Sequence, residues 1–323
     1  MSNWEGAASK LLATKRMTDR IYKYLSGAVG GSAIVFIVLA VAVLAYAAYP
    51  SFIANGLGFF TKTAWNTKDS SYGMLVFVVG TLASSAIAIV LAVPVGLGAA
   101  VFLTQVAPRR IAGPVSIMIE MLAGIPSVVY GFWGLTVLGP YLLHDLEPFL
   151  AQNFSFIPIF AGPVYSPGLL AAGIILAIMI IPIIASISRD MMARSPKELI
   201  EGAKALGLTR WEITRSVALP FAKTAIIGSI VLGLGRALGE TMAIAMLSGA
   251  GVVQLPLTLY YPAPTIASYM ALTLNGAFSD PMNISALMEL AIVLVMMTVT
   301  VNVIARLLIK QGFTTSSENL VRV

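Results

Sequence analysis

The chain has 323 residues, of which 58% are hydrophobic and only 11% are charged. An ordinary soluble domain carries roughly 25% charged residues, so this composition argues against a soluble protein and indicates a chain that faces lipid. Cysteine is absent and His144 is the only histidine, which excludes disulfides, thiol catalysis and a Cys/His metal cage. The net charge of +6 does not indicate nucleic-acid binding, because the basic residues are spread along the chain and form no patch.

Apolar runs long enough to cross a bilayer recur along the chain. A hydrocarbon core of about 30 Å needs roughly 20 apolar residues per helix. We therefore expect an all-α, polytopic membrane protein with six transmembrane helices. The predicted spans cover residues 28–48, 74–103, 112–139, 168–187, 224–249 and 286–305. Around them the sequence predicts an N-terminal tail (1–27), a single transmembrane domain (28–309) and a C-terminal tail (310–323).

The basic residues concentrate on one side of these spans. Five precede the first span, two follow the second, seven lie between the fourth and the fifth, and three lie at the C-terminal end. The intervening loops hold only Lys62 and Lys68, and Arg236 is inside a span. Because Lys and Arg concentrate in cytoplasmic loops, we expect a multi-pass protein of the cell membrane with both termini in the cytoplasm.

The second long outer loop, 250–285, contains a segment with helical spacing. Apolar residues follow Pro264 at positions typical of one helix face, namely Ile266, Tyr269, Met270 and Leu274. A short re-entrant or interfacial helix and an ordered surface loop fit this segment equally well.

The cytoplasmic loop 188–223 holds the densest charge and two successive helix-start signals. The first, 195–198 (SPKE), fits a capping box with Pro at the first helical position. Gly207 then supplies a left-handed stop, and 209–212 (TRWE) repeats the box before Leu219-Pro220 returns the chain to the membrane. These signals predict two helices joined by a glycine turn. They fit either an amphipathic hairpin on the membrane surface or a docking site for a partner.

The same loop resembles a family motif. The order Glu201-Gly202-Ala203, Gly207 and Leu219-Pro220 resembles the EAA loop of importer permeases of the ATP-binding cassette class, with Gly202 in place of the first Ala. The resemblance implies that the loop docks into a groove on a separate ATPase subunit. No Gly-Lys pair occurs in the chain, so the sequence lacks the phosphate-binding loop of an NTPase. ATP would be used by a partner subunit, and this chain would bind no cofactor.

Four charged residues lie inside the predicted spans: Glu120, Arg236, Glu240 and Glu289. Each would cost at least about 3 kcal/mol facing lipid at mid-depth, so each is expected to face the bundle interior, a partner or water. Arg236 and Glu240 are four residues apart, which predicts one shared helix face. Two interpretations stay open. The residues form a self-neutralising pair that fixes packing, or the guanidinium of Arg236 binds an oxyanion.

Two segments resemble the PstC-type permease of the bacterial and archaeal phosphate importer. They are 233–243 (GLGRALGETMA) and 119–131 (IEMLAGIPSVVYG), and the similarity extends from about 74 to 309. It implies a type I importer permease bundle that moves inorganic phosphate inward by ATP-driven alternating access. The implied partners are a second homologous permease subunit, two copies of an ATPase and an extracytoplasmic phosphate-binding protein. Arg236 would touch phosphate in transit, with Glu240 as its partner and Glu120 lining or bracing the pathway.

Other functions remain open on the sequence. A permease for molybdate, sulfate or another oxyanion would share the loop and the topology. A secondary transporter or channel would use the intramembrane carboxylates but would not require the capped cytoplasmic hairpin. An intramembrane enzyme is least favoured, because no arrangement of nucleophile, base and carboxylate accompanies His144. The sequence predicts no catalytic residues and no metal site.

Overall fold

The computed structural model describes residues 2–164, 167–248 and 253–320. In these residues the regular elements are helical, apart from one isolated bridge between Asn66 and Ser71. This confirms the predicted all-α, polytopic fold. Five helical stretches are long and apolar enough to cross a membrane. Their elements are α1 (Ser2–Asn55), α3 (Leu75–Val101) with η1 (Phe102–Val106), α8 (Leu169–Ala193), α10 (Arg210–Ile213) with η5 (Thr214–Ala218) and α11 (Leu219–Leu238), and α14 (Pro281–Leu320).

The third predicted span, 112–139, is wrong as a single straight helix. α4 (Arg109–Ala123) ends before Pro126, and the helix that begins with α5 (Ser127–Trp133) is bent by 92° from it. Pro126 causes the break because it has no backbone N–H and disfavours helical backbone at Ile125. The second arm continues through η2 (Gly134–Leu138), α6 (Gly139–Tyr141), η3 (Leu142–Leu146) and α7 (Glu147–Asn153). The predicted six spans are reached only if this bent pair counts as one.

The fifth predicted span, 224–249, is also interrupted. α11 ends at Leu238, and a separate short helix, α12 (Met242–Leu247), follows. Gly239 is the C-cap, and glycine costs about 1 kcal/mol in a helix interior. The Glu240 carboxylate then accepts a hydrogen bond from the backbone N–H of Ala243 (3.2 Å), which favours a new helix start. Residue 249 lies outside the described residues.

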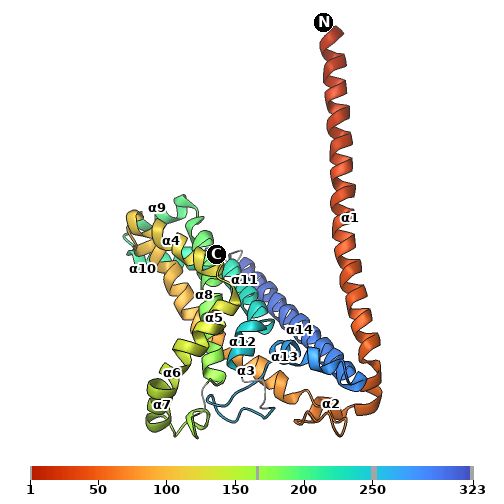
Figure 1. The fold of residues 1–323 in the computed structure, drawn as a ribbon. Coiled ribbons are helices and arrows are strands. Elements are labelled where there is room, and N and C mark those ends of the chain that lie inside the picture. Colours follow the sequence, from red (N-terminus) through yellow and green to blue (C-terminus); the bar gives the residue numbers. More distant parts are fainter. Residues whose placement is uncertain (1, 165–166, 249–252, 321–323) are drawn as a thin grey trace.

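α8 is the central helix of the bundle (Figure 1). Its most apolar stretch is 67% buried, whereas that of α1 is not buried at all. Small residues bring α3 and α8 together: a Cβ on Gly173 would lie 2.4 Å from the Ile87 side chain, and one on Gly96 would lie 3.0 Å from Ile184. Such close approach is a common basis of helix association in membranes.

α1 is joined to the bundle near its C-terminal end, where it meets α14 (Figure 1). The Ser51 hydroxyl donates to Oε2 of Glu289 (2.7 Å), and the Ser51 backbone N–H donates to the Ser285 hydroxyl (2.9 Å). Glu289 is 4% exposed, so it faces the bundle interior as expected.

A helix does follow Pro264, as one of the two interpretations predicted. This helix is α13 (Ile266–Ala277), and Thr265 and Ser268 form a reciprocal cap at its start. It packs against aromatic side chains before and within α3, close to α2 (Gly58–Thr61). The ring centroid of Trp65 lies 4.9 Å from that of Tyr72 and 5.4 Å from that of Tyr269.

The orientation of the chain in the membrane stays a prediction. It can be tested by labelling single introduced cysteines, because the native chain has none. In Figure 1 the N-terminal end of α1 and the C-terminal end of α14 both lie toward the side of α9 (Lys197–Ala205) and α10. We expect single cysteines at Ser9 and Ser316 to resist an impermeant thiol reagent in intact cells. A cysteine at Ser155 should react. Labelling of position 9 or 316 without permeabilisation would contradict a cytoplasmic location of the termini.

Candidate functional site: a coupling loop and a broken-helix region

The loop 188–223, called the coupling loop because it resembles the EAA loop, forms the predicted pair of helices with a glycine turn. α9 ends at Ala205, and Gly207 adopts a left-handed backbone with φ of +81°. The N–H of Leu208 then reaches back to the carbonyl of Ala203 (3.2 Å). This bond closes the last turn of α9 in the way that glycine-terminated helices commonly do. The predicted left-handed stop is confirmed.

One of the two predicted capping boxes forms. The Thr209 hydroxyl accepts from the Glu212 N–H, and the Glu212 carboxylate accepts from the Thr209 N–H (2.7 Å), so the start of α10 is as predicted. The box predicted at Ser195 is wrong. Pro196 is the N-cap of α9, one residue later than expected, so Ser195 lies outside the helix. The Ser195 hydroxyl is buried and has no hydrogen-bond partner among the described residues.

The second helix of the loop joins the membrane helix without a break. α10, η5 and α11 run as one helical stretch from Arg210 to Leu238, so Leu219-Pro220 marks no interruption. Pro220 is tolerated because it lies in the first turn of α11, directly after the wide π-helical turn η5. α10 and the helix that carries Arg236 therefore belong to one continuous helical stretch.

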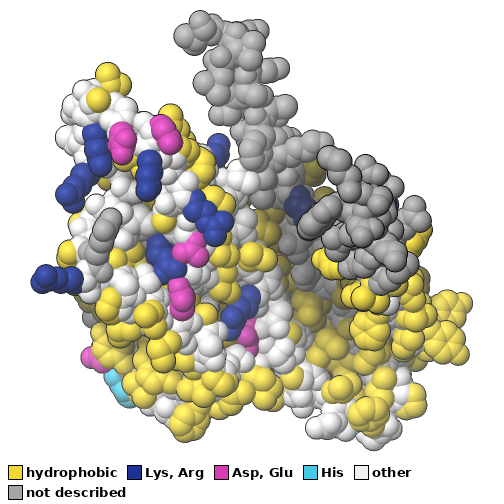
Figure 2. Space-filling view, turned by 90° about the horizontal axis from the view of Figure 1, so that it is seen from above, with side chains coloured by type: hydrophobic (Ala, Val, Ile, Leu, Met, Phe, Trp, Pro, Cys, Tyr) yellow, Lys and Arg dark blue, Asp and Glu magenta, His cyan; other side chains and the backbone are white. Residues whose placement is uncertain are grey.

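The motif residues of the loop lie at the surface. Glu201, Gly202 and Gly207 are exposed, whereas Ala203 is 8% exposed and packs inward. Figure 2 shows Lys and Arg side chains gathered on the face seen from above, around a few Asp and Glu. The exposed basic residues of this part of the chain are Arg194, Lys197, Lys204, Arg210, Arg215 and Lys223. The surface therefore combines exposed basic side chains with the exposed apolar side chains of Leu199, Leu206 and Trp211, and it is accessible to a partner.

Arg236 lies in the last turn of α11 with no ion pair or hydrogen bond to any described residue. It is partly buried, and its charge acts on the phenol of Tyr130 in α5. The Tyr130 hydroxyl donates to the carbonyl of Leu122 in α4 (2.9 Å). Arg236 therefore lies beside the break between α4 and α5, with its guanidinium donors available.

Arg236 and Glu240 are not the helical pair that their spacing predicts. α11 ends between them, and Glu240 turns its carboxylate to the start of α12. No ion pair joins the two residues among those described. The helix break redirects Glu240, so the i, i+4 rule does not apply. The interpretation as a self-neutralising pair therefore loses its structural basis. Both residues still lie in what we call the broken-helix region, which comprises the breaks between α4 and α5 and between α11 and α12.

Close packing fixes α5 against α12 in this region. A Cβ on Gly131 would lie 2.8 Å from the Cα of Ala243, so only glycine permits this approach. Gly134 is similarly close to Ile175 of α8, at 2.9 Å. The arm that follows the break between α4 and α5 is therefore packed closely against both α12 and α8.

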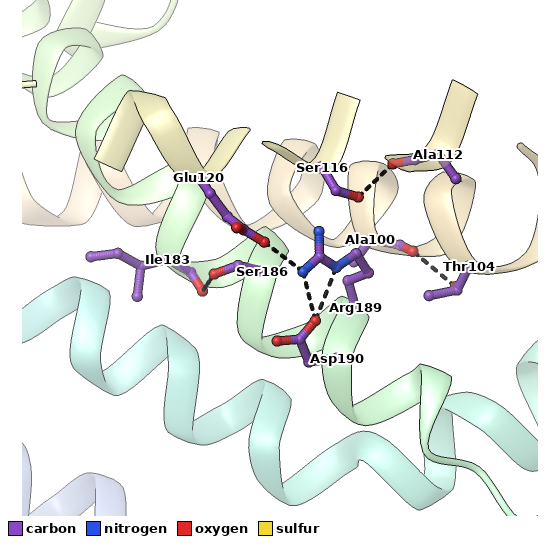
Figure 3. Close-up of polar contacts among 9 residues, drawn as sticks. All are labelled: Ala100, Thr104, Ala112, Ser116, Glu120, Ile183, Ser186, Arg189 and Asp190. Atoms are coloured by element: carbon purple, nitrogen blue, oxygen red, sulfur yellow. Dashed lines mark hydrogen bonds and ion pairs between the residues drawn. The ribbon is translucent and has the colours of Figure 1, made fainter. Parts of the chain in front are cut away.

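Glu120 is located elsewhere, in the last turns of α4. Its Oε1 accepts from Nη2 of Arg189 (2.7 Å), and the same nitrogen donates to Oδ1 of Asp190 (2.7 Å), as Figure 3 shows. Glu120 is 53% exposed at its side chain, Arg189 only 17%. Sequence reasoning did not single out Arg189, because its partner is 69 residues away. Its only local signal was a charged Arg-Asp pair at the end of an apolar run.

Comparison with known families identifies the class of this architecture. Residues 92–311 match the family described as the inner membrane component of binding-protein-dependent transport systems. The match covers more than half of the chain, and the chain belongs to this family. Members of this family are permease subunits of transporters in which ATP hydrolysis belongs to a separate subunit, and the membrane helices of this chain fit that class.

Within that class the chain is similar to phosphate permeases. It is 43% identical over 281 residues to the phosphate transport system permease protein PstC of Pasteurella multocida, covering 85% of this chain and 87% of that one. It is 41% identical over 279 residues to PstC 1 of Mycobacterium bovis, covering 80% and 82%. The similarity extends beyond the family-specific segments to most of the chain.

Solved structures support the fold. A chain of a bacterial alginate ABC transporter, solved with a periplasmic protein bound to an alginate pentasaccharide, matches with a TM-score of 0.58 and 19% identity. That match covers 91% of this chain and 98% of the other. A chain of the MetNI methionine ABC transporter in an inward-facing conformation matches with a TM-score of 0.50 and 19% identity, covering 74% and 94%. At such identity the likeness establishes the fold alone.

Proposed function

We propose that this chain is the membrane-spanning permease subunit of an ATP-driven importer that moves inorganic phosphate into the cytoplasm by alternating access. The names of the similar permeases support phosphate as the solute. The observation that carries the site is the unpaired guanidinium of Arg236 beside the broken helices. A membrane arginine without a protein partner requires water or an anion, and its planar donor fork matches the oxygens of phosphate.

Glu240 and Glu120 take different parts in this proposal. Glu240 lies two residues beyond the end of α11, where its carboxylate can accept a hydrogen bond from the hydroxyl group that phosphate keeps at neutral pH. Sulfate carries no such proton, so the carboxylate repels it. Glu120 braces the pathway through Arg189 and does not touch the ion. No step needs a cofactor on this chain.

The proposed assembly contains a second homologous permease subunit, two ATPase copies and an extracytoplasmic phosphate-binding protein. The exposed Glu201, Gly202 and Gly207 lie on the surface that would dock on one ATPase, with Ala203, Leu219 and Pro220 behind it. In this arrangement the complex lies in the cell membrane with both termini of this chain in the cytoplasm. The alginate transporter of similar fold was solved with a periplasmic protein, which supports a delivery partner here.

Uptake by the reconstituted complex tests both the solute and the role of Glu240. Proteoliposomes with ATP inside and loaded binding protein outside should accumulate labelled phosphate, and excess sulfate or molybdate should not compete. Glu240→Gln should reduce the preference for phosphate over sulfate by roughly tenfold, the equivalent of about 1.5 kcal/mol for one hydrogen bond to a charged group. Uptake of sulfate or molybdate in place of phosphate by the wild type would favour the other oxyanion permeases. An unchanged preference in Glu240→Gln would remove Glu240 from the site.

A further inference from the structure

The contact between Glu120 and Arg189 joins two elements that no other ion pair connects among the described residues. Arg189 belongs to the last turns of α8, and Glu120 to the last turns of α4. Figure 3 shows the guanidinium between Glu120 on one side and Asp190 on the other. Nη2 donates to both carboxylates at 2.7 Å, and Nε donates to Asp190 at 3.0 Å. Only the bond to Glu120 links separate helices.

α9 of the coupling loop also comes close to Arg189. A hollow of about 440 Å³ lies next to Arg189, and its walls come from η1, α4, α8 and α9. Ile200 of α9 lines it together with Ser116 of α4 and Thr104 of η1. A displacement of α9 therefore acts on a loosely filled junction of α4 and α8. The Glu120–Arg189 ion pair is a directional contact across this junction, in addition to the packing of α4 against α8.

The same end of α4 also contacts the helix that follows the break at Pro126. Two residues beyond Glu120, the carbonyl of Leu122 accepts the hydroxyl of Tyr130, and Tyr130 interacts electrostatically with Arg236. The last turns of α4 are thus held by Arg189 on one side and by Tyr130 on the other. A change in the position of α4 necessarily alters the surroundings of Arg236.

We infer that Arg189 is a positioning residue of the transport cycle. Its ion pair with Glu120 holds α4 against α8 next to α9 of the coupling loop. Movement of the coupling loop then carries α4 with it and changes the setting of Tyr130 and Arg236. This inference rests on the coupling-loop role proposed above. It assigns Arg189 and Glu120 a mechanical task and no contact with the transported ion.

Asp190 provides a matched control, because it makes an equally short contact with Arg189 within one helix. Glu120→Gln and Arg189→Gln are expected to lower the phosphate moved per ATP hydrolysed by about tenfold, the usual size of a coupling between sites. Asp190→Asn should stay within about twofold of the wild type. Assembly of the complex should be retained, because half-exposed ion pairs contribute little to stability. Equal losses in Glu120→Gln and Asp190→Asn, or normal coupling in Glu120→Gln, would overturn the inference.

A distance measurement separates this result from the identity of the solute. The chain has no cysteine, so spin labels can be placed at Gly113→Cys in α4 and Lys197→Cys in α9. Both positions are exposed, and a Cβ at Gly113 meets nothing within 4 Å. With ATP bound or absent, the label distance should stay narrow in the wild type and in Asp190→Asn, and broaden in Glu120→Gln. An unchanged distribution in Glu120→Gln overturns the link between α4 and α9, whichever ion the complex moves.

Discussion

Replacing Arg236 with Gln is expected to reduce phosphate uptake by at least about a hundredfold, since two charge-assisted hydrogen bonds of about 1.5–3 kcal/mol each are lost. Arg236→Lys keeps the charge but loses the planar fork, so it should retain a small part of the uptake. The expected order is therefore wild type, Lys, then Gln. The measurement is initial phosphate uptake divided by the amount of assembled complex.

Lys223 offers a control on the same helix as Arg236, because it is exposed near the start of α11. Lys223→Gln should leave uptake close to that of the wild type. The packing interpretation makes a separate prediction, that Glu240→Gln restores uptake to Arg236→Gln by removing a stranded charge. Since no ion pair joins the two residues, we expect no such recovery. Recovery in the double variant would contradict contact between Arg236 and phosphate.

Gly207→Val is expected to detach the ATPase while the permease still inserts into the membrane. Gly207 has φ of +81°, and a left-handed backbone costs a residue with a Cβ roughly 1–2 kcal/mol, with a β-branched side chain at the upper end. The turn between α9 and α10 must then change, which moves the exposed face of the loop. Co-purification of the ATPase should fall by about tenfold, the equivalent of about 1.4 kcal/mol.

Two substitutions control for this experiment. Gly207→Asn should have a milder effect, because Asn tolerates left-handed backbone. Gly202→Ala should have none, since Gly202 is within α9 and an added Cβ meets nothing within 4 Å. A complex of Gly207→Val that assembles and hydrolyses ATP normally would contradict the docking role of the loop.

The coupling loop was predictable because its signals are local. Gly207 ends one helix and Thr209 begins the next through hydrogen bonds that span only a few residues. The box predicted at Ser195 failed because α9 begins one residue later than expected, with Pro196 as its N-cap. Boundaries of this kind depend on how the preceding helix packs, which the local sequence does not contain.

The broken-helix region was less predictable, for a related reason. Hydropathy continues through Pro126 and through Gly239, so the spans 112–139 and 224–249 ran across both breaks. Pro126 was visible in the sequence, but membrane helices tolerate proline, and only the packing of the two arms determines a bend of 92°. Arg236 was found because a charge in an apolar run is conspicuous. Its separation from Glu240 followed from the break, and the partner of Glu120 was too distant in sequence to infer.

The π-helical turn η5 determines the angular phase between the coupling loop and α11. A wide turn of this kind accommodates one residue more than the α-helical pitch, and each residue of an α-helix turns the chain by about 100°. A one-residue deletion within Thr214–Ala218 that restores regular pitch would therefore leave α10 and α11 in nearly the same angular phase, whereas the same deletion in a regular turn of α11 would rotate the two parts by about 100° relative to each other. A substitution at the same positions leaves the phase intact. η5 is therefore the segment of this helical stretch in which the loss of one residue changes the orientation of the loop least.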